Sequence, residues 1–141
     1  LIVGQIGLDR GDPMSFASHV LSDRLAPGTG PEVLLQESTG DGIIPNITTE
    51  ALARALELPL VEPAQLGAPG LERNPTPTCG SPASALSQFL ISDVPFQAHL
   101  ALESQTVQAQ VMTWFQSFVD EDPGNDGNIA FVSLGSEIDC D

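Results

Sequence analysis

A short apolar run that ends in a Gly-Asp-Gly turn constrains this chain most. Val33-Leu34-Leu35 has the composition of a short buried strand, expected to extend to residue 37. In the turn that follows, Gly40 and Gly42 flank Asp41, and both glycines can adopt backbone angles that hold a carboxylate on a tight bend. Because open α/β sheets place functional groups just past the carboxyl ends of their strands, Asp41 is a candidate functional residue. A plain turn is the competing interpretation, since Asp-Gly is common in turns.

A second apolar segment lies downstream and leads to a histidine. Residues 88–92, Gln-Phe-Leu-Ile-Ser, are predicted to form a second buried strand. A helix predicted over 49–58 separates the two strands, so we expect them to run parallel with a right-handed crossover. The chain after the second strand reaches His99. Asp41 and His99 would therefore each lie just past the end of a strand.

Helical periodicity marks two further segments. Residues 13–25 are predicted to form an amphipathic helix that Asp12 caps. His19 lies off the apolar stripe of this helix and is interpreted as a surface residue. Residues 104–119 are predicted to form a longer helix, in which Trp114 is interpreted as a core anchor. Strands that alternate with helices indicate the α/β class.

The remaining segments carry weaker signals, and the 141 residues are expected to form part of a single domain. Residues 62–84 are rich in proline and glycine and are predicted to be one long loop. Residues 1–8 are interpreted as the tail of a helix that begins before Leu1, and residues 129–134 as a last strand. No apolar run approaches the roughly 20 residues that a transmembrane helix needs.

The charge of the chain is strongly negative. It has 19 acidic residues against 4 basic ones, all of them arginine, and a formal net charge of −15. Such a charge argues against a nucleic-acid partner and against electrostatic attachment to an anionic membrane. It is compatible with a soluble protein of a secretory or saline setting.

The two cysteines, Cys79 and Cys140, lie in turn-rich segments. Neither belongs to a Cys-x-x-Cys motif or has a histidine at metal-ligand spacing, so no zinc site is expected. A disulfide between them is favoured over two buried thiols. The acidic residues 120–128 could hold calcium, but their spacing does not match an EF-hand, and a solvated loop is the favoured interpretation.

The pattern as a whole resembles the C-terminal part of α/β-hydrolases, in particular secreted bacterial lipases and esterases. The acid turn Gly40-Asp41-Gly42-Ile43-Ile44-Pro45 and the later Ala98-His99-Leu100 carry the resemblance, which covers roughly residues 10 to 120. The order of acid and then histidine matches that family. However, these residues contain no Gly-x-Ser-x-Gly. The resemblance therefore implies that the nucleophile and its oxyanion loop lie upstream of Leu1.

The resemblance implies a division of roles in a Ser-Asp-His triad. His99 would be the general base, and Asp41 would orient its ring and stabilise the imidazolium. Asp93 is the alternative acid, being closer to His99 in sequence. The substrate would be an ester or lipid, and Ile43, Ile44, Phe96 and Leu100 could line an acyl pocket. No cofactor or metal is implied, and the protein would act outside the cell or in the cell envelope.

Several alternatives remain open from sequence. The chain could be a non-catalytic acidic interaction or calcium-binding module, or part of another α/β enzyme such as a peptidase. In the hydrolase interpretation these residues alone are inactive, because the nucleophile is missing. A sheet without its preceding strand would expose an apolar edge, so association with the upstream half or with a second copy is expected.

Overall fold

The computed structural model describes residues 11–28, 30–74, 84–92 and 94–118. These residues form a four-stranded sheet in the order β1-β4-β2-β3, with every pair parallel. The strands are β1 (Leu34–Ser38), β2 (Leu60–Val61), β3 (Arg73–Asn74) and β4 (Ala85–Phe89). The α-helices are α2 (Asn46–Ala55), α3 (Pro95–His99) and α4 (Gln105–Ser117). Within the described ranges, short 3-10 helices lie at Pro13–Ser15, Ala17–His19 and Ala101–Glu103.

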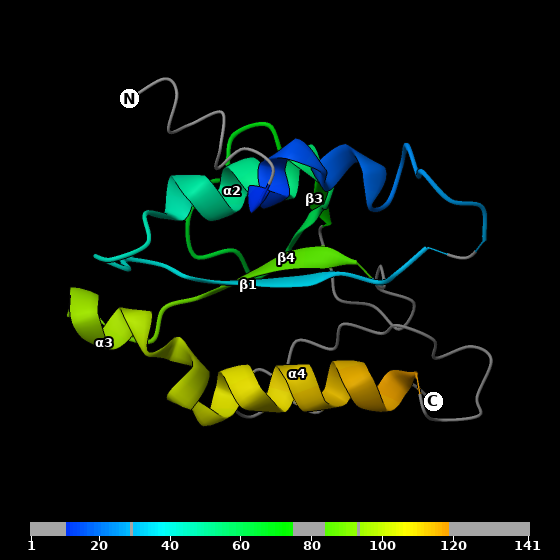
Figure 1. Ribbon diagram of the computed structural model, residues 1–141. Coiled ribbons are helices and arrows are strands. Elements are labelled where there is room, and N and C mark those ends of the chain that lie inside the picture. Colours follow the sequence, from blue (N-terminus) through cyan, green and yellow to red (C-terminus); the bar gives the residue numbers. More distant parts are fainter. Residues whose placement is uncertain (1–10, 29, 75–83, 93, 119–141) are drawn as a thin grey trace, which may run out of the picture.

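The sheet is covered on both faces, as a parallel sheet requires (Figure 1). α2 and the two N-terminal 3-10 helices lie on one face, and α4 lies on the other. The larger apolar core is on the α2 face and consists of Ala17, Ala53, Leu56, Leu58, Leu60, Ala68 and Leu86. On the α4 face, Trp114 packs against the buried Val61 and Ala85. The α/β class and the prediction of Trp114 as a core residue are confirmed.

The pairing of β1 with β4 positions the candidate residues Asp41 and His99. Their register runs from Leu34 opposite Ala85 to Ser38 opposite Phe89, so the two strands end side by side. Beyond the register, the Thr39 N–H still donates to the carbonyl of Phe89 at 2.8 Å. The expected parallel arrangement of these two strands is confirmed. The turn after β1 and the segment after β4 therefore leave the sheet at the same edge.

β1 forms one edge of this sheet. Ala85 N–H donates to the carbonyl of Val33, and Thr39 N–H points toward β4 as well. In a strand the backbone groups of alternate residues point to opposite sides, so those of Leu34, Gln36 and Ser38 point away from β4. Within the described ranges no strand pairs with β1 on that side.

The second strand lies three residues earlier than predicted, at Ala85–Phe89 and not 88–92. The apolar run Phe89-Leu90-Ile91 predicts a strand that begins after Ser87, but Ser87 and Gln88 are fully buried within β4 and Leu90 is exposed. Ser87 accepts a hydrogen bond from Gln110 of α4, and Gln88 donates one to Glu37 of β1. These partners make buried polar residues tolerable in the strand.

The predicted bounds of the helix at 49–58 are also wrong, since α2 spans Asn46–Ala55. It begins directly after Pro45 and cannot continue through Glu57, which adopts φ of 59°. The expected loop at 62–84 is likewise interrupted by β3. By contrast α4, at Gln105–Ser117, agrees closely with the helix predicted over 104–119.

The continuous helix predicted over 13–25 is replaced by two short 3-10 helices. Its start is as expected, because the Asp12 carboxylate accepts the Met14 N–H at 2.9 Å. Further on, His19 N–H bonds to the Phe16 carbonyl three residues back, which is the 3-10 pattern. Ser22 Oγ donates to the carbonyl of Ser18, and such side-chain bonds compete with a regular helix.

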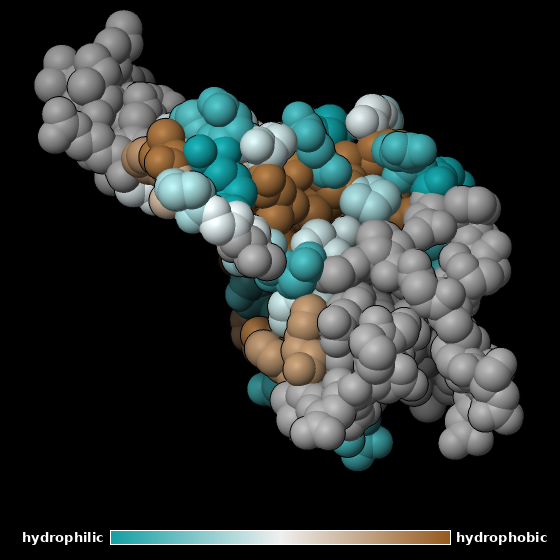
Figure 2. All heavy atoms as spheres, turned by 90° about the vertical axis from the view of Figure 1, so that its right-hand side faces the viewer, coloured by the Kyte–Doolittle hydropathy of each residue, from teal (hydrophilic) through white to brown (hydrophobic). Residues whose placement is uncertain are grey.

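Several expectations fall outside the described residues. They concern the segments 1–8 and 129–134, the acidic residues 120–128, the alternative acid Asp93, and the proposed Cys79–Cys140 disulfide. Among the helices that are described, none has the length and apolar character needed to cross a membrane. Figure 2, which views the molecule from the end opposite α3, shows apolar residues on this face bordered by hydrophilic ones.

Candidate functional site

The turn after β1 holds Asp41 in one orientation. Gly40 adopts φ of 81°, the left-handed region that glycine tolerates best, and this bends the chain sharply out of the strand. One oxygen of the Asp41 carboxylate, Oδ1, accepts the backbone N–H groups of Ile43 at 2.7 Å and Ile44 at 3.0 Å. The other oxygen, Oδ2, is left free for a partner outside the turn.

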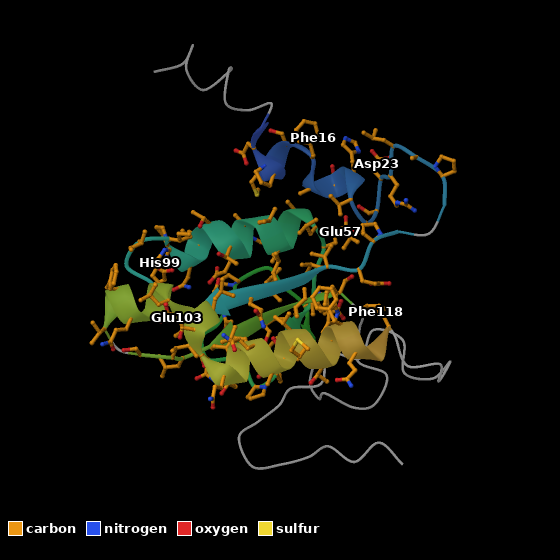
Figure 3. The ribbon with its side chains drawn as sticks, turned by 60° about the horizontal axis from the view of Figure 1, so that its bottom comes forward. Phe16, Asp23, Glu57, His99, Glu103 and Phe118 are labelled. Carbon is orange, nitrogen blue, oxygen red and sulfur yellow. The ribbon has the colours of Figure 1, made fainter. Side chains whose placement is uncertain are left out.

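That partner is His99, the last residue of α3. The N–H at Nδ1 of His99 donates to Oδ2 of Asp41 at 2.9 Å, across 58 positions of sequence. α3 follows β4 and packs through Ala98, which is fully buried, so the helix carries the ring to the turn after β1. Figure 3 shows His99 between α3 and this turn. The structure thus brings together the two residues that the sequence singled out.

The surroundings of Asp41 favour its charged form. Burial acts to raise the pKa of Asp41, but the N–H groups of Ile44 and Ile43 and the ring of His99 together outweigh it. The pKa of this carboxyl is therefore lowered below its usual value. At neutral pH Asp41 is a carboxylate that can orient an imidazole and stabilise its protonated form.

The second ring nitrogen of His99 remains available. Among the described residues, Nε2 has no hydrogen-bond partner, and the His99 side chain is 32% exposed whereas that of Asp41 is only 11% exposed. A buried acid behind an accessible imidazole leaves Nε2 free to accept a proton from a group outside the described residues.

The other histidine provides an internal comparison. His19 also contacts an aspartate, Asp23, with Nδ1 at 3.3 Å from Oδ2, and Figure 3 labels Asp23 far from His99. This pair is local in sequence, and the Asp23 side chain is 83% exposed. Exposed pairs of this kind contribute little to the stability of the fold, which agrees with the interpretation of His19 as a surface residue.

The apolar residues suggested for an acyl pocket lie near the pair but are open to solvent. Ile43 and Ile44 belong to the acid turn, Phe96 to α3, and Leu100 directly follows His99. All four are exposed. Their role as pocket residues stays a prediction.

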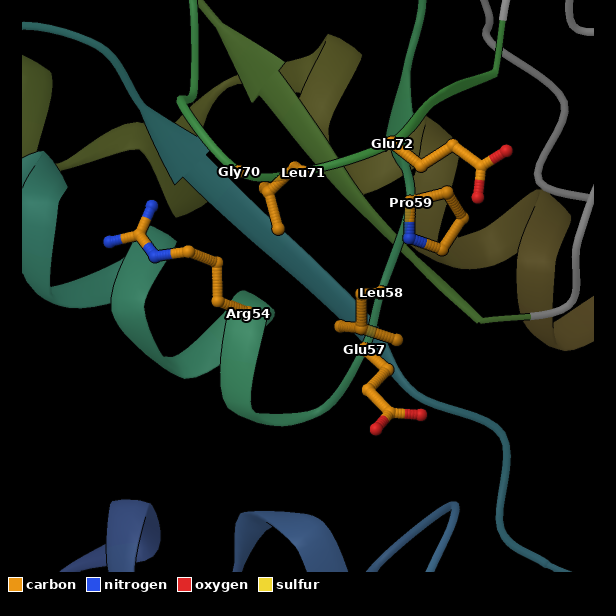
Figure 4. Close-up of a pocket in the computed structure, with 7 residues that line it drawn as sticks. All are labelled: Arg54, Glu57, Leu58, Pro59, Gly70, Leu71 and Glu72. Carbon is orange, nitrogen blue, oxygen red and sulfur yellow. The ribbon is translucent and has the colours of Figure 1, made fainter.

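A cavity of about 320 Å³ lies elsewhere, at the C-terminal end of α2 (Figure 4). Arg54, Glu57 and Leu71 are among its lining residues. The turn that carries Asp41 precedes the N-terminal end of α2, so the cavity is at the opposite end of this helix. The cavity therefore does not belong to the Asp41–His99 site.

Sequence reasoning assigned no role to Asn46, the first residue of α2. Its Oδ1 accepts the Gly40 N–H at 3.0 Å, and its Nδ2 donates to the Ser38 carbonyl at 2.8 Å. A polar residue of turn-forming type directly after Pro45 was the available signal. Its two partners are not predictable from sequence, because they depend on how the turn folds back onto the helix.

Glu37, near the end of β1, was also missed. Its side chain is buried on the α2 face, where Oε1 accepts a hydrogen bond from Gln88 at 2.8 Å and Oε2 has no partner. Burial raises the pKa of Glu37 to about 7, with Gln88 opposing the rise and the charge of Glu50 adding to it. The carboxyl therefore titrates near neutral pH in the folded protein.

The titration of Glu37 predicts that the free energy of unfolding falls as the pH rises. The folded pKa of Glu37 is above its ordinary 4.5, so the folded state holds this proton more tightly than the unfolded state does. The stability that results is fully present below pH 4.5 and is lost as the pH rises from there through about 7. At about 1.4 kcal/mol per pKa unit, the loss amounts to as much as about 3 kcal/mol. We expect Glu37→Gln to remove this dependence and to be more stable than the wild type at about pH 8.

Urea unfolding at several pH values measures this difference. Glu103→Gln is the matched control, because Glu103 is exposed on the 3-10 helix before α4. The control is expected to keep the pH dependence of the wild type. The same dependence in Glu37→Gln would contradict the assignment to Glu37.

Comparison of the chain with protein-family models, curated proteins and solved structures finds no match. Within the described ranges, no group of three or more histidine, cysteine, aspartate or glutamate residues is placed to hold a metal ion. Conclusions about function therefore depend on the geometry of the Asp41–His99 pair.

Proposed function

We propose that these residues are the C-terminal part of a serine ester hydrolase of the α/β-hydrolase type. In this proposal Asp41 and His99 are the acid and the base of a Ser-Asp-His triad. The serine nucleophile comes from a segment outside the 141 residues, in the upstream half of the same protein or in a separately cleaved chain. The substrate is an ester or lipid, and the site of action is the cell envelope or the extracellular space.

The observation that carries the proposal is the 2.9 Å hydrogen bond between His99 Nδ1 and Asp41 Oδ2. Three features support a catalytic role for this hydrogen-bonded pair. The two residues follow adjacent parallel strands, β1 and β4, which is where open α/β sheets place functional groups. The acid is nearly buried, and its pKa is lowered. The far nitrogen of the ring has no partner among the described residues.

The proposed reaction proceeds in two halves. Nε2 of His99 takes the proton of the serine hydroxyl while the serine oxygen attacks the ester carbonyl carbon. The protonated ring then donates this proton to the departing alcohol, which leaves an acyl-enzyme. In the second half, His99 takes a proton from water, the hydroxide attacks the acyl carbon, and the proton returns to the serine oxygen. Throughout, Asp41 remains ionised and keeps Nδ1 protonated.

The side of β1 with which no strand of the described ranges pairs supports the proposed partner. A strand of the upstream half would pair with the backbone groups of Leu34 and Gln36, which point away from β4. Self-association through the same edge is the competing arrangement.

Covalent labelling tests the proposal. The full-length protein is treated with an alkyl fluorophosphonate, which phosphonylates activated serines, while hydrolysis of p-nitrophenyl butyrate is followed. We expect activity and label to disappear together, and peptide mass spectrometry to place the label on a serine outside residues 1–141. The 141 residues alone are expected to show neither hydrolysis nor labelling.

Two results would contradict the proposal. One is phosphonylation of a serine within the 141 residues, and the other is esterase activity of these residues by themselves. Hydrolysis of amide substrates in preference to esters would favour the peptidase alternative.

A further inference from the structure

We propose that Asn46 is a positioning residue, which holds the acid turn closed so that Asp41 meets His99. This inference rests on the proposed hydrolase function, and it assigns a role to a residue whose side-chain hydrogen bonds go to neither His99 nor the Asp41 carboxylate. The side chain of Asn46 bonds to the chain on both sides of Thr39, at the point where β1 ends and the turn begins.

The two hydrogen bonds of Asn46 secure two different parts of this junction. Nδ2 donates to the carbonyl of Ser38, which points away from β4 and has no strand to pair with on that side among the described residues. Oδ1 accepts the N–H of Gly40, the residue whose positive φ turns the chain out of the strand. The first contact ties α2 to the end of β1, and the second fixes the direction in which the turn departs.

Asp41 is thereby held between two fixed points. On its N-terminal side, Gly40 is bound by Asn46, and Thr39 is bound through its N–H and its hydroxyl to the Phe89 carbonyl of β4. On its C-terminal side, the N–H groups of Ile43 and Ile44 hold Oδ1. Loss of the Asn46 contacts leaves Thr39 bonded to Phe89 but frees Gly40, and this lets the carboxylate shift relative to His99.

A carboxamide is the group that meets both requirements. It presents a hydrogen-bond acceptor to the Gly40 N–H and a donor to the Ser38 carbonyl at the same time. An ionised aspartate would keep the acceptor but lose the donor, and alanine would lose both. Misplacement of a catalytic group by about 1 Å can cost roughly 100-fold in rate.

The test is a double-mutant cycle in the full-length protein with p-nitrophenyl butyrate as substrate. If Asn46 acts through Asp41, Asn46→Ala should lower kcat by about 10- to 100-fold and leave KM within about twofold. In an Asp41→Ala background the same substitution should change kcat by less than about twofold, because the group that Asn46 positions is already gone.

A matched control is provided by Thr48, in the same first turn of α2. Its Oγ1 donates to the Pro45 carbonyl at 2.7 Å, so Thr48→Val also removes a side-chain bond at the start of the helix but leaves in place the bonds of Asn46 to Ser38 and Gly40. This variant should keep the kcat of the wild type. If Asn46→Ala does not fold, Asn46→Asp serves in its place, with the same dependence on Asp41 expected because the Ser38 carbonyl loses its donor.

The outcomes separate this inference from the proposed function. An equal loss from Asn46→Ala with and without Asp41 would mean a general structural role and would overturn the inference. So would an unchanged kcat in Asn46→Ala when Asp41→Ala is impaired. If Asp41→Ala itself retains full activity, the proposed triad is wrong, and the positioning role is wrong with it.

Discussion

Alanine in place of His99 is expected to remove nearly all ester hydrolysis by the full-length protein. The serine hydroxyl is a weak nucleophile without a base, and Nε2 of His99 is the nitrogen proposed to take its proton. Loss of the histidine from such a triad costs about 10⁴-fold or more in kcat, and substrate binding by the rest of the site is unaffected. Steady-state kinetics with p-nitrophenyl butyrate measure the effect.

The chain contains its own control for this experiment. His19→Ala removes the other histidine, whose partner Asp23 is exposed and only four positions away. This variant is expected to retain the kcat and KM of the wild type. Equal losses in the two variants would point to a general effect on folding, and full activity in His99→Ala would disprove the proposed base.

Asparagine in place of Asp41 is expected to lower kcat by about 10⁴-fold with little change in stability. Asparagine has nearly the same shape, and its Oδ1 can still accept the N–H groups of Ile43 and Ile44. The Nδ2 group would then face Nδ1 of His99 as a donor and favour the ring tautomer with the proton on Nε2. That tautomer cannot accept the proton of the serine.

Two measurements accompany the Asp41→Asn variant. Thermal unfolding should give nearly the midpoint of the wild type, since the turn keeps its two backbone hydrogen bonds. Asp23→Asn, the corresponding change in the surface pair, should leave kcat unaltered. Wild-type activity in Asp41→Asn would exclude Asp41 as the acid and direct attention to Asp93.

Local patterns in the sequence were sufficient to predict the elements that depend on near neighbours. The acid turn is one of them, because Gly40, the Asp41 carboxylate and Pro45 determine its shape over a few residues. The apolar face of α4 is another, and its bounds agree with the helical spacing of its residues. The parallel pairing of β1 and β4 followed from the helix between them.

The errors have two causes: distant partners override local preference in β4, and local hydrogen bonds compete with a regular helix in the N-terminal segment. β4 was predicted three residues late because Ser87 is a poor core residue by itself. Ser87 and the adjacent Gln88 are buried because they form hydrogen bonds with Gln110 of α4 and Glu37 of β1. The N-terminal segment reads as a helix from its apolar spacing, yet bonds among its own backbone and serine side chains divide it into two 3-10 turns.

The residues of the candidate site were readable from the chain, whereas their contact was not. A carboxylate in a Gly-Asp-Gly turn and a histidine after a second strand are each visible as local features. Whether Oδ2 of Asp41 reaches Nδ1 of His99 depends on the register that places Ser38 opposite Phe89, and on α3 carrying the ring back toward the turn. Sequence patterns determine short-range backbone conformation, but the meeting of two side chains across 58 positions requires the packed sheet, because only packing sets the distance between strand ends.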